Sequence, residues 1–425
     1  MFVLIIQVIT IVLALTISHQ HRLIASPIVV PVNKHTDAAK PLYSALAHFN
    51  TSYNWHNQNG APISEPEPEQ RLLIDLDAPF IWHYSYPRQE SCDTCPLSVT
   101  CRESPCTDLR TTFSYQSPSC PQPTNHSLYD GYYDCEFCPV NIINPVTGLC
   151  EQVIATYDQI MFPLNNSDVY ISYYPTAGST PPWTFDQFPA NVFGVIALSS
   201  SEYALPAYLH DPVKKVIALC LPSTLSAPGA LFLGAGPYYL PPPRSNVDVR
   251  SFISYVNLLK RPNSFGYFIG VEAIVIKNRS INVPGNVTAK ISTLDPYTTL
   301  RTDVYNSVVR RFSKVTKRIP PAKAVEPFGV CFNVTSGGNG TKVPDIDLVL
   351  EGGKKWSIST ANSMKQVTDD VACLAVVDGG PMSEHVIVVG AYQLEDNFLV
   401  FDLENGSFGF SSSLLRRQTS CSNFK

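Results

Sequence analysis

The stretch that decides the fold lies near the end of the chain and reads Val386-Ile-Val-Val-Gly-Ala-Tyr-Gln-Leu-Glu-Asp-Asn-Phe-Leu-Val-Phe-Asp402. Its runs of β-branched and aromatic residues, interrupted by a glycine and polar residues, predict strands. Similar apolar runs recur at residues 28–32, 71–76, 153–157, 230–234 and 266–270. With 36 prolines, 22 glycines and a charged fraction of 15%, the chain is predicted to be a loop-rich, mostly β protein.

One segment, residues 302–317, has the spacing of an amphipathic helix. Val304, Val308 and Phe312 recur every four residues, and Thr302 is expected to cap the helix. At about 150 residues per domain, 425 residues predict two or three domains, so two large lobes would fit. The proline-rich segment 236–244 is a candidate connector between lobes, or alternatively a surface loop within one lobe.

The N-terminus and the cysteines predict secretion. Residues 1–17 are apolar and small residues follow at Ala25 and Ser26, which is typical of a signal peptide over residues 1–25; a membrane anchor is the alternative. We therefore expect an oxidising, extracellular location and no later membrane span. Eight Asn-x-Ser/Thr sequons support this location as candidate glycosylation sites: Asn50, Asn125, Asn165, Asn278, Asn286, Asn333, Asn339 and Asn405.

The 12 cysteines are distributed unevenly. Two Cys-x-x-Cys pairs in the first half could hold zinc, but no further cysteine or histidine group completes a compact site, so we favour disulfides in a stapled insertion and no metal. The eight cysteines of this cluster are Cys92, Cys95, Cys101, Cys106, Cys120, Cys135, Cys138 and Cys150. A formal net charge of −5 gives no indication of nucleic-acid binding.

Several motifs together resemble one plant group of pepsin-like aspartic protease homologues. Besides the stretch quoted first, they are Lys290-Ile-Ser-Thr-Leu-Asp-Pro-Tyr-Thr298, Pro344-Asp-Ile-Asp-Leu348, Ala361-Asn-Ser-Met364 and Phe410-Ser-Ser-Ser-Leu-Leu415. The group comprises extracellular dermal glycoproteins, TAXI-type xylanase inhibitors, xyloglucanase-inhibiting proteins and basic seed globulins. The resemblance implies an all-β, pepsin-like bilobal fold with two six-stranded-type β lobes and few short helices. It also implies an N-terminal lobe over residues 26–238 with the cysteine-rich insertion, and a C-terminal lobe over residues 239–425.

Both catalytic motifs of this fold are degenerate here. Aspartic proteases need two carboxylates that share a proton, so that one is the base while the other is the acid. The first motif aligns with Asp75-Leu-Asp-Ala78, which keeps Asp75 but lacks the supporting glycine and hydroxyl. The second places Ser292 where the partner aspartate is expected, and Asp295 is three residues away. We therefore predict no peptidase activity, no cofactor, and for Asp75 a structural role.

The resemblance further implies disulfides and inhibitory loops. Cys331 is expected to pair with Cys373, and Cys220 with Cys421. The loop before the last cysteine is a candidate inhibitory loop that carries Arg416, Arg417 and Gln418, and which arginine would enter a target remains open. Arg318 and Lys323 lie in a second candidate loop after the helix, on a segment that could equally be a solvated basic face.

Three functions remain open at this stage. The first is a secreted, monomeric inhibitor of xylanases or xyloglucan endoglucanases of GH11 or GH12 type in the plant cell wall, with the two acidic residues of the glycosidase cleft as its target. The second is an extracellular storage, defence or peptide-binding globulin. The third is a residual aspartic endopeptidase.

Overall fold

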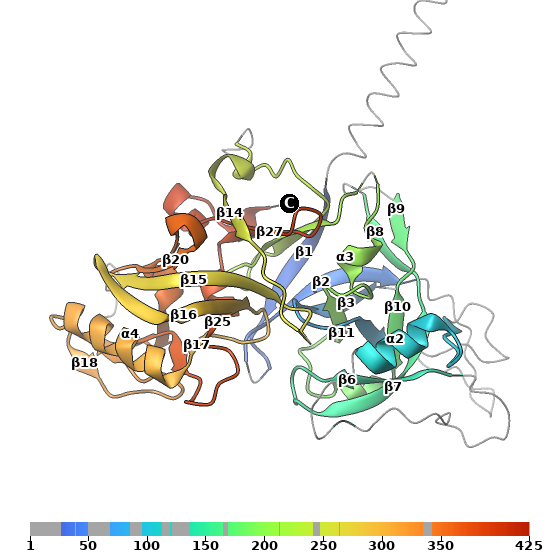
Figure 1. Cartoon of the computed structure of the whole chain (residues 1–425), viewed down its shortest axis with the longest axis horizontal. Helices are drawn as coiled ribbons and strands as arrows, with labels where there is room; N and C mark the ends of the chain where they lie inside the picture. The colour runs from blue at the N-terminus through green and yellow to red at the C-terminus, as the bar shows by residue number, and fades with distance from the viewer. Residues whose placement is uncertain are drawn as a thin grey trace, which may run out of the picture.

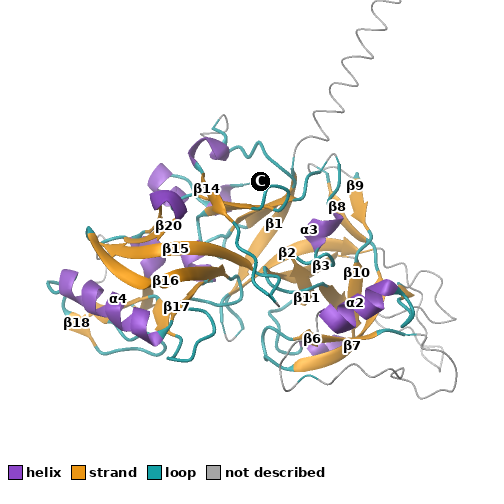
Figure 2. Ribbon diagram, viewed as in Figure 1, coloured by secondary structure: helices purple, strands orange, loops and turns teal. Residues whose placement is uncertain are grey.

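The structure is a computed structural model. It describes residues 27–38, 40–49, 69–85, 96–112, 120, 137–164, 169–211, 213–240, 247–262, 264–334 and 342–424. Figure 1 shows two lobes side by side, with strand β1 (Ile28–His35) between them. Figure 2 shows that strands predominate and helices are few. The predicted mostly β architecture is confirmed.

The largest sheet in the described part of the chain runs through the first lobe and into the junction between the lobes. Its 16 strands include segments from both ends of the chain, because β1 pairs with β13 while β12 pairs with β26. Its main path is β14 (Ser254–Asn257), β27 (Ser407–Phe410), β26 (Phe398–Asp402), β12 (Val216–Cys220), β13 (Gly229–Leu233), β1, β2 (Leu42–Phe49), β3 (Glu69–Asp75), β11 (Val192–Ala197), β4 (Ile81–Tyr84), β10 (Thr176–Thr180), β7 (Cys150–Tyr157) and β5 (Leu97–Ser98). Beside this path lie β6 (Pro139–Ile143), β8 (Ile160–Pro163) and β9 (Tyr170–Tyr173).

Two further sheets form most of the second lobe. The seven-stranded sheet has the order β21 (Lys354–Ile358), β20 (Ile346–Leu350), β15 (Tyr267–Ile276), β16 (Arg279–Ile291), β25 (Ile387–Val389), β17 (Thr298–Leu300) and β24 (Val376–Asp378). The four-stranded sheet has the order β18 (Pro321–Ala322), β19 (Cys331–Asn333), β23 (Val371–Leu374) and β22 (Met364–Thr368). Each of the six apolar runs chosen from the sequence overlaps a strand, although the stretch 386–402 also contains the helix α6 (Ala391–Leu394).

The longest described helix is the one that the sequence predicts. α4 (Thr302–Val315) buries Val304, Val308 and Phe312 against the second lobe. Thr302 is not its cap, however, because Arg301 holds the N-cap position and the Thr302 hydroxyl donates to Asp378 at 2.7 Å. The other helices are α2 (Ser104–Thr112), α3 (Leu205–Tyr208), α5 (Thr360–Ser363) and α6 (Ala391–Leu394), with 3₁₀ turns η1 (Pro182–Phe185), η2 (Val249–Phe252), η3 (Glu351–Gly353), η4 (Leu414–Arg417) and η5 (Cys421–Asn423).

The disulfides include both pairings implied by the resemblance. Cys220 is bonded to Cys421 across 201 residues, and Cys331 to Cys373. In the insertion, Cys106 is bonded to Cys138 and Cys120 to Cys150. Cys138 is therefore not available to zinc, and Cys101 is disulfide-bonded as well. Cys92, Cys95 and Cys135 lie outside the described residues.

The lobes are tied together in their shared sheet and by polar contacts. Glu395, just after α6, is buried and its carboxylate accepts from Lys34 of β1 at 2.7 Å and from the Tyr43 hydroxyl of β2 at 2.5 Å. The predicted lobe boundary at residue 238 does not separate two sheets, because β12 and β13 precede it, β26 and β27 follow it, and all four belong to the shared sheet. The signal-peptide region lies outside the described residues, and no helix among those described is long and apolar enough to cross a membrane.

Candidate functional site

The two motif loops occupy equivalent places in the two lobes. β3 runs parallel to β11 with Ile74 opposite Ile196, and Asp75 follows Ile74. β16 runs parallel to β25 with Ile291 opposite Val389, and Ser292 follows Ile291. Asp75 and Ser292 thus hold equivalent positions in the two lobes, each directly after an isoleucine that is paired with a parallel strand.

A cross-lobe hydrogen bond holds the loops together. The Thr293 hydroxyl, in the second loop, donates to the backbone carbonyl of Ile74 in the first at 2.6 Å, and Thr293 is buried. The equivalent residue of the first loop is Leu76, which is also buried and has no hydroxyl. The reciprocal side-chain hydrogen bond, from the first loop to the second, therefore cannot form.

Asp75 has a carboxylate in an unfavourable electrostatic environment. Its Oδ1 accepts from the backbone N–H of Asp77 at 2.8 Å. Burial and the nearby charge of Asp77 raise the pKa of Asp75 to about 6. The bond to a backbone amide fits the structural role that the sequence suggested.

Ser292 uses its hydroxyl within its own loop. The side chain is buried, and its Oγ accepts from the backbone N–H groups of Asp295, at 3.0 Å, and Leu294, at 3.3 Å. These bonds close a local turn, which is a common role for serine. Lys40 is a cation whose pKa responds to this area: burial lowers it, while the charges of Asp295 and Asp75 oppose that shift.

An ion pair fills the place of the missing glycine. Asp77 is paired with Lys290 at the end of β16, and its Oδ1 accepts from the Ser264 hydroxyl at 3.1 Å. Burial disfavours the charged amine, but the carboxylates of Asp77 and Asp75 raise the pKa of Lys290 overall. Sequence reasoning missed Lys290 and Ser264 because both lie about 190 or more residues from Asp77. The only signal was a lysine directly before the second motif.

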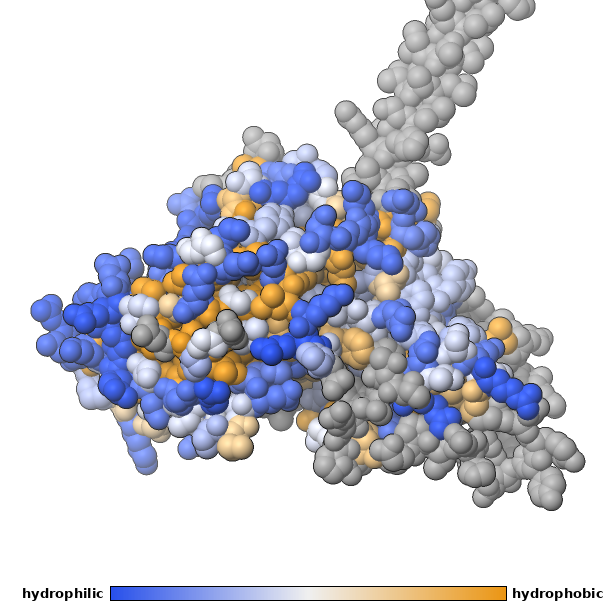
Figure 3. Space-filling model, in the orientation of Figure 1, coloured by the Kyte–Doolittle hydropathy of each residue, from blue (hydrophilic) through white to orange (hydrophobic). Residues whose placement is uncertain are grey.

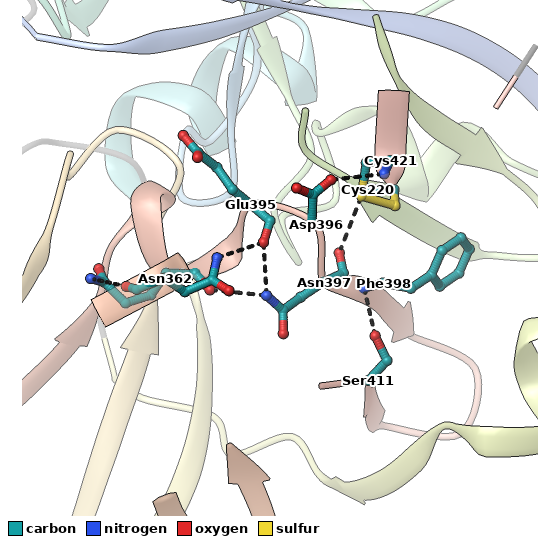
Figure 4. The surroundings of a disulfide bond; sticks show 9 residues. Cys220, Asn362, Glu395, Asp396, Asn397, Phe398, Ser411 and Cys421 are labelled. Atoms are coloured by element: carbon teal, nitrogen blue, oxygen red, sulfur yellow. Dashed lines mark hydrogen bonds between the residues drawn. A yellow bond between two sulfur atoms is a disulfide. The ribbon is translucent and has the colours of Figure 1, made fainter. Parts of the chain in front are cut away.

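The loop with the candidate arginines is firmly anchored. Figure 4 shows the disulfide between Cys220 and Cys421 with the backbone N–H of Cys421 bonded to Asp396, at 2.8 Å. Just before it, Arg416 is exposed and pairs with Asp345 at 2.5 Å. The Arg417 guanidinium lies 3.8 Å from the centre of the Phe252 ring, and Gln418 adopts a left-handed conformation with φ of 56°.

The structure does not bring the two candidate loops together. Arg318 follows the end of α4 and lines a pocket with Lys317, while the exposed Lys323 follows β18. In Figure 1, α4 and β18 lie at the outer end of the second lobe, whereas the C-terminus lies near the middle of the molecule. The two groups would thus meet different parts of a partner.

Of the eight sequons, three have an asparagine whose exposure is described: Asn278, Asn333 and Asn405 are all exposed. Asn286 lies in β16, and nothing is described of its side chain. The sequons at Asn50, Asn125, Asn165 and Asn339 lie outside the described residues.

Two lobes that face each other through matching strand-loop motifs define a pepsin-like protein. The sequence agrees with this class: residues 61–235 match the family model described as xylanase inhibitor N-terminal, and residues 266–412 match the model described as xylanase inhibitor C-terminal. The chain therefore belongs to the xylanase inhibitor family of pepsin-like proteins.

Relatives of the chain carry diverse names. It is 32% identical to "Chitinase CLP" of Oryza sativa subsp. japonica, over 94% of this chain and 91% of that protein. It is 32% identical to "Probable aspartic proteinase GIP2" of Nicotiana benthamiana, over 83% and 85%. Among solved structures, that of edgp has a TM-score of 0.75 at 27% identity and that of conglutin gamma from lupine seeds 0.74 at 25%, each covering 94% of this chain and 98% of its own. The family thus includes seed globulins as well as proteins named as enzymes.

Proposed function

We propose that this chain is a secreted, monomeric glycoprotein of the plant apoplast that lacks peptidase activity and inhibits cell-wall glycoside hydrolases. Its targets would be xylanases or xyloglucan endoglucanases of GH11 or GH12 type. Loops of the C-terminal lobe would enter the active-site cleft of the target. The observation that carries the proposal is the exposed Arg417, held on a loop that a disulfide and a ring contact keep in place.

The motif loops argue against peptidase chemistry. An aspartic protease needs a second carboxylate opposite the first, and the equivalent position holds the Ser292 hydroxyl, which is already bonded within its own loop. The ion pair of Asp77 and Lys290 occupies the same region. Loss of one member of an acid–base pair typically reduces the rate about 10²- to 10⁴-fold.

Arg417 is better suited than Arg416 to enter a glycosidase cleft. Arg416 already shares a hydrogen bond with Asp345. The Arg417 guanidinium lies over the Phe252 ring and donates to no other residue that the structure describes, so its N–H donors are available to a carboxylate. A glycosidase cleft presents two carboxyl groups, so a bidentate arginine contact fits its chemistry.

The test is an inhibition panel. The purified protein is titrated against GH11 and GH12 enzymes, and Arg417→Ala, Arg416→Ala and Arg310→Ala are compared, the last as an exposed control on α4. We expect at least a tenfold loss of inhibition for Arg417→Ala, a smaller loss for Arg416→Ala and none for the control. Absence of inhibition by the unaltered protein at micromolar concentration across the panel would contradict the proposal.

A storage or peptide-binding globulin is the second candidate. The chain is 41% identical to "Gamma conglutin 1" of Prunus dulcis over 56% of each chain, which favours this alternative. High abundance in seed together with no inhibition in the panel would support it. A residual endopeptidase, the third candidate, would instead cleave protein substrates at acid pH in a pepstatin-sensitive manner.

A further inference from the structure

A cationic pocket lies at the outer end of the second lobe, away from the motif loops and from Arg417. It is an open hollow of about 560 Å³, formed where the turn between β15 and β16 meets the end of α4. In Figure 3 this end of the molecule is hydrophilic. Its cations come from two segments: Lys277, Arg279, Arg311, Lys314, Lys317 and Arg318.

The charge of the cationic pocket is local and uncompensated. Among the residues that the structure describes, no acidic one lines it, although the whole chain has a formal net charge of −5. None of its six cations forms an ion pair with another described residue. Arg311 donates to the carbonyls of Ile276, at 3.1 Å, and Lys277, at 3.0 Å, and so fixes the turn against the helix. Like charges held this close repel one another, and an anion would relieve that repulsion.

The helix alone does not account for the cluster. Cations near the C-terminal end of α4 favour its macrodipole, and this explains Lys314. Lys277 lies in the β15–β16 turn instead, and Arg279 is the first residue of β16. Lys277 has φ of 48°, in the left-handed region where turns usually have glycine or asparagine, so propensity does not explain a lysine there.

We propose that the cationic pocket binds a carboxylated polysaccharide, a polyuronate chain, and thereby tethers the protein to an acidic polymer. The cations lie on two segments, so a ligand with carboxylates repeated along one chain contacts more of them than a single small anion does. Arginine and lysine both form charge-assisted bonds to carboxylates. The proposal does not depend on hydrolase inhibition, because Arg416 and Arg417 lie elsewhere.

The test measures binding of the full-length protein to polygalacturonate by calorimetry and by retention on an immobilised polymer at increasing salt. The variant Lys277→Gln/Arg279→Gln/Lys314→Gln removes three charges without touching Arg318. The control Lys214→Gln/Lys215→Gln/Lys355→Gln removes three exposed charges elsewhere. We expect a roughly 3- to 150-fold loss of affinity for the pocket variant, since three exposed pairs are each worth about 0.2–1 kcal/mol and about 1.4 kcal/mol is tenfold, and less than a twofold loss for the control. Thermal unfolding checks that both variants fold.

Two further polymers test whether the ligand is recognised by its carboxylates. Fully methyl-esterified polygalacturonate, which has the same backbone without charge, should not bind. Dextran sulfate that binds while polygalacturonate does not would overturn the assignment to carboxylates, and equal losses in the two triple variants would overturn the site. Asn278 lines the same pocket and begins a sequon. Asn278→Gln leaves all six cations in place and should bind at least as tightly as the unaltered chain.

Discussion

Replacement of Asp75 by asparagine should stabilise the protein at neutral pH. Asparagine keeps an oxygen that can accept from the backbone N–H of Asp77 but removes the charge that burial and Asp77 disfavour. The pKa of Asp75 is about 6 in the fold against an ordinary value of 3.8, and each unit corresponds to about 1.4 kcal/mol. Because the side chain is only partly buried, we expect a gain of about 1–3 kcal/mol above pH 7.

The pH dependence gives the sign of the effect. The folded pKa lies above the unfolded one, so the folded protein binds the proton more tightly and ionisation of Asp75 destabilises the fold. This penalty is absent well below pH 4, grows between about pH 4 and 6, and is complete above about pH 7. Denaturant midpoints of the unaltered chain and of Asp75→Asn should therefore diverge as pH rises through this window.

Asp303→Asn is the control with the opposite sign. A hydrogen bond from Arg301 lowers the pKa of Asp303 to about 2, so its charge stabilises the fold at neutral pH and that variant should lose stability there. A loss of stability for Asp75→Asn at pH 7, or a gain that stays constant from pH 4 to pH 8, would refute the reasoning about Asp75.

Three further predictions follow from named contacts. Thr293→Val removes the buried bond to the Ile74 carbonyl and should cost about 1–3 kcal/mol in the free energy of unfolding, while Thr293→Ser keeps the hydroxyl and should cost less; equal costs would show that the bond contributes little. Conversion of Cys220 and Cys421 together to alanine opens a loop of 201 residues and should lower stability by roughly 5 kcal/mol in the chain-entropy account, with faster proteolysis near the C-terminus as the readout; unchanged stability would contradict a role for this bond. Incubation with casein at pH 3 to 5 should give no cleavage that pepstatin blocks, and a pepstatin-sensitive activity lost in Asp75→Asn would show that the site is catalytic.

Much of the fold could be predicted because its signals are local. Alternating and continuous apolar runs mark strands, and the four-residue spacing of Val304, Val308 and Phe312 marks α4. The prediction that Thr302 caps α4 was wrong. Several residues near a helix start can hold the cap position, and the Thr302 hydroxyl instead donates to Asp378, which lies 76 residues away. The resemblance implied the two long disulfides, which local spacing alone does not indicate.

The sequence by itself determined which residues stand in the motif loops: Asp75 remains, and a serine occupies the second position. Only the tertiary structure decided what those residues contact. In the packed fold Asp77 forms an ion pair with Lys290, and the Thr293 hydroxyl donates to the Ile74 carbonyl. The β15–β16 turn lies beside the end of α4, and together they form the cationic pocket. The physical reason is that strand composition follows from nearby residues, whereas these contacts depend on the registers of strands far apart in the chain, which only the packed fold defines.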